Sequence, residues 1–65
     1  MTPADVRLRV AAIEAAHDDY EMAHSDEDSL HHDVLRAIAA GAPNAAELAA
    51  EALRTLELDF PRYCA

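Results

Sequence analysis

Apolar residues recur every three or four positions along most of this chain, which is the spacing of one face of an α-helix. The segment Thr2-Pro3-Ala4-Asp5 looks like a helix start, because threonine can cap, proline suits the first turn and aspartate complements the helix dipole. We expect a first helix over about residues 3–24. Its apolar face is formed by Val6, Val10, Ile13, His17, Tyr20 and His24.

A second helix is expected over about residues 26–40. Ser25 can cap it, and the three acids that follow would fill the first turn, where the helix dipole favours negative charge. Asp18 and Asp19 would then lie near the end of the first helix, where the dipole disfavours them, so a break near Ser25 is favoured over one continuous rod. Gly41 supplies a left-handed stop.

A third helix is expected over about residues 45–57. Asn44 is the predicted N-cap, and Glu47 stands three residues later as its capping-box partner. In the tail that follows, Asp59 can cap a last helical turn, while Phe60 and Tyr63 are expected to fold back onto the core. The last two helices would form an antiparallel hairpin, with the first packed over it.

The predicted fold is therefore all-α, with one helical domain over residues 1–65. A chain of this length buries only ~60% of its unfolded surface, so it is marginal alone. Cys64 is the single cysteine, which rules out an intramolecular disulfide. Because alanine-rich faces bury little area, we expect self-association, and a second apolar strip of Leu8, Ala12 and Met22 offers one contact.

Charge limits the classes of partner. The chain has 13 carboxylates, five arginines and no lysine, which gives a net charge of -8. Nucleic acid is an improbable partner because phosphate binding needs clustered cations. We instead expect a protein partner with a basic surface, and an adaptor or inhibitor role. The predicted contact residues lie in an acidic stretch without a cation: Asp18, Asp19, Asp26, Glu27 and Asp28.

A metal site is the alternative interpretation. His17 and His24 each follow a glutamate by three residues, and such Glu-x-x-His pairs occur in di-iron helical bundles. Glu14, His17, Glu21 and His24 would be the ligands of a metal-binding homodimer. Acids are so frequent here that these pairs also arise by chance, and the preferred interpretation includes no cofactor.

Catalysis is not expected. The run His31-His32-Asp33 could transfer protons, but the sequence places no nucleophile or oxyanion donor beside it. The helix–turn–helix around Gly41 occurs in DNA-reading domains, yet the helix after the turn carries three glutamates against Arg54, which is the wrong sign. With no signal peptide and no apolar run of ~20 residues, a cytoplasmic protein away from membranes is expected.

Two segments carry a resemblance to a known group of proteins. The stretch Ala23–Leu30 followed by Asp33–Ala39, and the ending Leu58–Ala65, resemble short acidic proteins of actinobacteria and their phages. Tyr63 stands where tryptophan is frequent in that group. The resemblance covers about half of the chain and has no catalytic motif. It implies a small cytoplasmic helical protein, compatible with a phage-borne origin, in which His24, Asp28, Asp33 and the tail matter.

Overall fold

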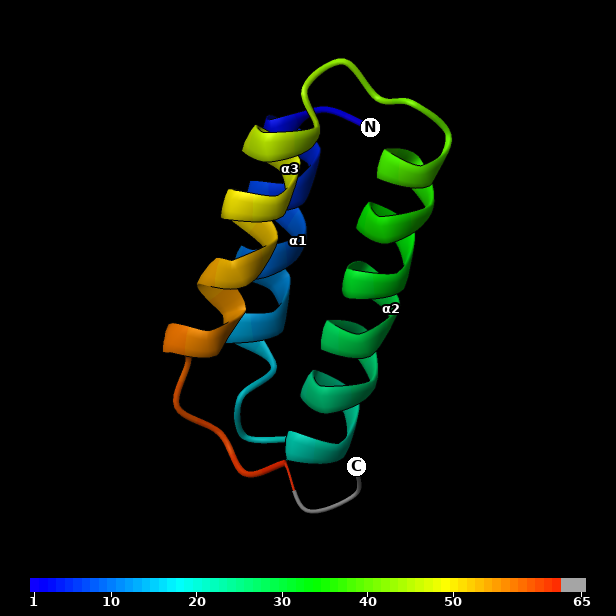
Figure 1. The fold of residues 1–65 in the computed structure, drawn as a ribbon. Coiled ribbons are helices and arrows are strands. Elements are labelled where there is room, and N and C mark those ends of the chain that lie inside the picture. The colour runs from blue at the N-terminus through cyan, green and yellow to red at the C-terminus, as the bar shows by residue number, and fades with distance from the viewer. Residues whose placement is uncertain (63–65) are drawn as a thin grey trace.

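A computed structural model describes residues 1–62 of the chain as a bundle of three helices. Helix α1 spans Pro3–Ala15, α2 spans Tyr20–Ala39 and α3 spans Ala45–Ala52, and a short 3-10 helix, η1, continues α3 over Leu53–Glu57. The chain runs down α1, up α2 and down α3, so consecutive helices are antiparallel (Figure 1). The all-α prediction is confirmed, as is the hairpin of the last two helices.

The start of α1 is the predicted one. The Asp5 backbone N–H donates to Thr2 Oγ1 at 3.2 Å, and the Thr2 backbone N–H donates to the Asp5 carboxylate at 2.8 Å. This reciprocal capping box satisfies two backbone donors that the helix itself cannot use. The bond from the Thr2 backbone, followed by that from its hydroxyl, lowers the pKa of Asp5 below its usual value.

The break between the first two helices lies at residues 16–19, so the prediction of a break near Ser25 is wrong. Asp19 is the N-cap of α2, and its carboxylate accepts from the Met22 backbone N–H at 3.3 Å. Ser25 lies inside α2 and is exposed. Ending the first helix before Asp18 and Asp19 places these acids at the start of the second helix, where they are favoured.

The turn between α2 and α3 follows the prediction for Gly41. Gly41 adopts φ +91, which an L side chain rarely reaches. The Gly41 N–H donates to the Ile38 carbonyl at 2.9 Å and the Ala42 N–H donates to the Ala37 carbonyl at 3.1 Å. These two bonds form a Schellman motif, which satisfies carbonyls at the end of α2.

The third helix departs from its prediction at both ends. Asn44 is its N-cap residue, but the capping box with Glu47 is absent, because the Asn44 backbone (ψ 34) is not in the extended conformation typical of side-chain caps. The α-helix tightens to 3-10 geometry at Leu53. The predicted last turn capped by Asp59 does not begin within the described residues, since residues 59–62 are not helical.

The core lies where the three helices meet. Phe60 is buried in it, as predicted, while Tyr63 and Cys64 lie outside the described residues. No helix within residues 1–62 is long and apolar enough to cross a membrane. The buried hydrophobic residues are Val6, Ile13, Ala23, Leu30, Val34, Leu48, Ala52 and Phe60.

Candidate interaction surface

The five arginines are all engaged in ion pairs within the chain. Two of these pairs clamp α1 onto the hairpin: Arg7 reaches Glu51 of α3 at 2.9 Å, and Arg9 reaches Asp33 of α2 at 2.8 Å. Each of these carboxylates also pairs with a second arginine, which lies three residues further along the chain. The remaining pairs are Arg36–Asp33, Arg54–Glu51 and Arg62–Glu27.

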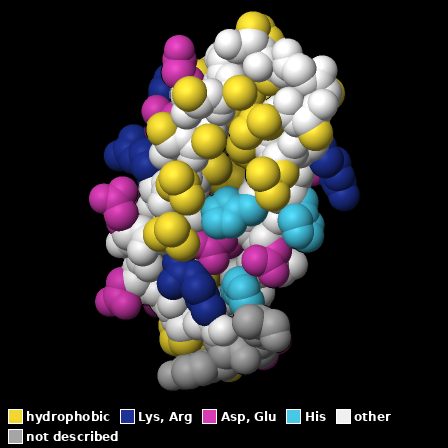
Figure 2. Space-filling model, in the orientation of Figure 1, with side chains coloured by type: hydrophobic (Ala, Val, Ile, Leu, Met, Phe, Trp, Pro, Cys, Tyr) yellow, Lys and Arg dark blue, Asp and Glu magenta, His cyan; other side chains and the backbone are white. Residues whose placement is uncertain are grey.

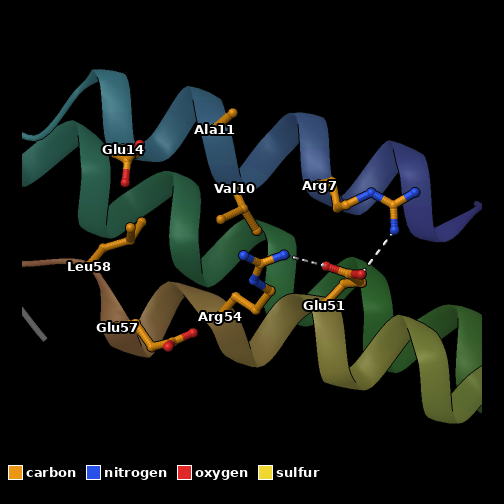
Figure 3. Close-up of a pocket in the computed structure, with 8 residues that line it drawn as sticks. All are labelled: Arg7, Val10, Ala11, Glu14, Glu51, Arg54, Glu57 and Leu58. Carbon is orange, nitrogen blue, oxygen red and sulfur yellow. Dashed lines mark hydrogen bonds and ion pairs between the residues drawn. The ribbon is translucent and has the colours of Figure 1, made fainter.

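The surface groove between α1 and α3 contains two of these pairs. Arg7 and Arg54 approach the Glu51 carboxylate from opposite sides (Figure 3). The hydrogen bond from Arg7 is the main reason that the pKa of Glu51 lies below its usual value. The Arg9 hydrogen bond has the same effect on the pKa of Asp33. Glu14 and Glu57 also line this groove of about 340 Å³, so it holds carboxylates outside the arginine pairs as well.

Four of the five predicted contact residues are exposed. Asp18 and Asp19 lie in the α1–α2 turn, and Asp26 and Asp28 lie on α2. They do not form one patch, because residues two apart on a helix point to different sides. Asp26 lies beside Arg9 and Ala12 of α1, whereas Asp28 accompanies His24 on another side of α2. The carboxylates therefore surround one end of the bundle.

Glu27 is the fifth predicted contact residue, and it is not on the surface. Its side chain is 4% exposed, and its carboxylate accepts from Arg62 Nε at 2.8 Å and from Arg62 Nη2 at 3.2 Å. In α2, position 27 is four residues after buried Ala23 and three before buried Leu30, which places it on the core side. Glu27 is therefore an internal partner of Arg62.

The surroundings of Glu27 decide its charge. Burial has the largest single effect and would by itself raise the pKa of Glu27, but hydrogen bonds from Arg62 and Thr55 and the Arg62 charge together lower it below the usual value. The same pairing raises the pKa of Arg62. The ion pair is thus fully charged at neutral pH.

Arg62 holds the tail in place and was missed by the sequence analysis. Besides Glu27, its guanidinium donates to the carbonyl oxygens of Thr55 at 3.0 Å and Phe60 at 3.1 Å. Its Cζ lies 4.0 Å from the centroid of the Phe60 ring, a cation–π distance. The available signal was the spacing that places Glu27 on the buried face of α2, since a buried carboxylate needs a cation.

His31 belongs to the same internal network. Its Nε2 lies 2.9 Å from Thr55 Oγ1 and 3.3 Å from the Ala52 carbonyl oxygen. Because a carbonyl oxygen can only accept, Nε2 carries the proton. The Thr55 hydroxyl in turn donates to the Ala52 carbonyl at 3.1 Å and is fully buried. His32 is exposed, and Asp33 serves the arginines, so the predicted His31-His32-Asp33 run is divided among three roles.

The structure does not bring the four alternative metal ligands together. Because α1 ends at Ala15, His17 Nδ1 bonds the Glu14 backbone carbonyl at 2.9 Å instead of pairing with its side chain. His24 Nε2 lies 3.6 Å from Asp28 Oδ1, and Glu21 is exposed to solvent. Across residues 1–62, no group of three or more histidine, cysteine or acidic side chains is arranged to hold a metal ion.

An apolar groove of about 240 Å³ lies between α2 and α3, on the face shown in Figure 2. Leu35 and Leu53 line it and are 62% and 58% exposed. Helical spacing predicted Leu53 on the core face of the third helix, but the buried positions of this segment are Leu48, Ala52 and Thr55, so Leu53 lies beside the core. The other lining residues include His31, Ile38, Ala49 and Ala52.

No protein-family model matches the chain, and no match to it was found among curated proteins or solved structures.

Proposed function

We propose that this protein is a non-catalytic interaction module that binds a partner protein through the partner's basic surface. The observation that supports this is the internal use of every arginine. Five arginines pair with three carboxylates, Glu27, Asp33 and Glu51. Within residues 1–62, the other ten of the 13 carboxylates have no arginine partner.

This pairing engages the arginines within the chain, so the carboxylates outside these pairs set the sign of the surface charge. An exposed arginine beside an acid would compete with a partner's cations, but here the arginines are held against α2, α3 and the tail. The carboxylates around the α1–α2 end face solvent, and Asp18 is 95% exposed. A field of one sign accelerates encounter with a basic partner and disfavours acidic ones.

Two further observations support a binding role rather than chemistry or nucleic-acid recognition. Thr55 is the hydroxyl beside His31, and its complete burial keeps substrates away from it. Within residues 1–62, the ion pairs occupy every arginine, so phosphate groups would have to displace carboxylates. Self-association, a cytoplasmic location and a phage origin stay predictions from the sequence.

The test is capture of partners from a lysate of the source cells at low and high salt. The variant Asp18→Asn/Asp26→Asn/Asp28→Asn removes three charges from the α1–α2 end without touching the Asp19 cap. Affinity for the captured partner should fall roughly tenfold, since each exposed ion pair contributes about 0.2–1 kcal/mol. Capture by the wild-type chain should also weaken as salt rises.

The matched control compares the single variants Asp18→Asn and Glu47→Gln, because Glu47 is an exposed carboxylate in the first turn of α3, at the opposite end of the bundle. Glu47→Gln should lose much less affinity. Equal losses in both variants, or capture that does not depend on salt, would contradict the proposal.

A further inference from the structure

The hairpin of α2 and α3 offers two grooves, and α1 occupies one of them. In Figure 1, α1 lies along α3 on one side of the hairpin. The contacts of this helix show what such a groove accepts. Val6, Val10 and Ile13, spaced four and three apart, place apolar side chains along it. Two arginines flank these apolar residues. Arg7 pairs with a carboxylate on α3, and Arg9 pairs with one on α2.

The second groove is the apolar one of about 240 Å³ between Leu35 on α2 and Leu53 on α3. Its wall residues on α2 run from His31 to Ile38, which corresponds to two helical turns, or roughly 10 Å. The small residues Ala49 and Ala52 form its α3 side, where a helix backbone can approach closely. The volume is below the ~300–1,000 Å³ typical of small-molecule sites, so side chains of another protein fit it better.

Acidic residues lie on α2 beyond the His31 end of this groove. Glu21, Asp28 and Leu35 are spaced by seven residues along the unbroken helix α2, and this spacing places them nearly in line. Figure 2 shows this face: hydrophobic side chains fill its middle, and histidine, acidic and arginine side chains lie toward the α1–α2 end. Asp28 keeps 60% of its side chain exposed. The groove is thus apolar along its length and anionic at one end.

We propose that the α2–α3 groove binds a basic amphipathic helix of the partner protein. Its apolar side chains, spaced as Val6, Val10 and Ile13 are in α1, would pack between Leu35 and Leu53. Its lysine or arginine residues would meet Asp28 and Glu21 beyond the His31 end. This proposal rests on the proposed function and names the surface and the class of ligand. Charge complementarity favours this occupant over a second copy, because each copy carries a charge of -8.

The test uses a synthetic helical peptide of about 15 residues, long enough to span the groove. It carries leucines at the α1 spacing and lysines at the flanking positions, and a matched peptide carries glutamates in place of the lysines. Binding is measured by fluorescence anisotropy. Leu35→Ser and Leu53→Ser should each weaken binding of the basic peptide ~10-fold, because each removes one leucine contact.

Two controls distinguish binding in the groove from non-specific binding of the basic peptide to the acidic protein. Leu8→Ser alters an equally exposed leucine on α1 and should leave the affinity within about twofold, since it lies outside the groove. Glu21→Gln/Asp28→Asn should weaken binding more than Asp26→Asn/Glu47→Gln, which removes the same charge elsewhere. Circular dichroism confirms that the variants keep their helices.

Unchanged affinity in both groove variants would overturn the groove assignment, and the proposed function would survive if neutralising the acids still abolished partner capture. Equal binding of the acidic peptide would overturn the basic character of the ligand. A wild-type dimer that Leu53→Ser dissociates and that excludes the peptide would assign the groove to a second copy and overturn the proposal.

Discussion

The guanidinium of Arg62 is held from three directions: by the Glu27 carboxylate, by backbone carbonyls and by the face of the Phe60 ring. These contacts join the tail to α2 and η1, and they account for a charged residue on the buried side of α2. The pair is asymmetric, since Glu27 is 4% exposed and Arg62 is 31% exposed. Loss of the Arg62 contact would therefore leave a charge in the interior, whereas Arg62 can still reach water.

The first prediction concerns this pair. Glu27→Gln should lower the free energy of unfolding by about 2 kcal/mol, because charge-assisted hydrogen bonds to Arg62 are lost at a buried site. Urea denaturation measures the change. Glu47→Gln, at an exposed position without an arginine partner, is the control and should change stability by less than about 0.5 kcal/mol. Equal stability of both variants would show that the pair does not stabilise the fold.

The helices begin and end where backbone groups find partners. Thr2 with Asp5 starts α1, Asp19 starts α2, and Gly41 ends it through a Schellman motif. Thr2 and Gly41 could be identified from local sequence because each offered one solution. The start of α2 could not be identified in this way, because both Asp19 and Ser25 can cap a helix. Which of them does so depends on the packing that buries Ala23 and Leu30.

This choice leads to a test of helix α2. Asp19→Ala should lower the free energy of unfolding by about 1 kcal/mol, since the bond to the Met22 N–H is lost. Ser25→Ala should have no cost or stabilise slightly, because alanine is the better residue inside a helix. Thermal and urea unfolding of the two variants give the comparison. A larger loss at Ser25 than at Asp19 would place the helix start where the sequence analysis did.

For the bundle as a whole, paired carboxylates couple stability to pH. The pKa values of Glu27, Asp33 and Glu51 are all lower than usual, because arginines stabilise their charged forms against the cost of burial. The folded state therefore binds fewer protons than the unfolded chain around these pKa values. Stability from these groups is complete above their usual pKa values and is lost as pH falls through the lowered ones.

Denaturation midpoints should consequently stay level from pH 7 to about 5 and fall below about pH 4.5. Urea titrations at fixed temperature across this range measure the effect. The Glu27→Gln variant should show a shallower fall, because one of the three coupled groups no longer titrates. A midpoint that rises on acidification would mean that relief of repulsion among the other carboxylates outweighs the ion pairs.

The local patterns of this chain were enough to predict three helices, the N-cap at Thr2, the stop at Gly41 and the docking of Phe60. They were enough because each depends on backbone geometry within a few residues or on hydrophobic burial. Net charge also followed directly from composition. Asp18, Asp26 and Asp28 are exposed, but Glu27, predicted beside them, is buried.

Contacts between distant segments had to come from the packed bundle. Glu27 and Arg62 are 35 residues apart, so spacing along α2 could place Glu27 on the buried face but could not identify Arg62 as its partner. The position of the first break and the apolar groove between Leu35 and Leu53 likewise depend on how the helices are placed. Short-range spacing predicts which elements form, because helix energetics are local, whereas the partners of a side chain are set by neighbours that the chain supplies from elsewhere.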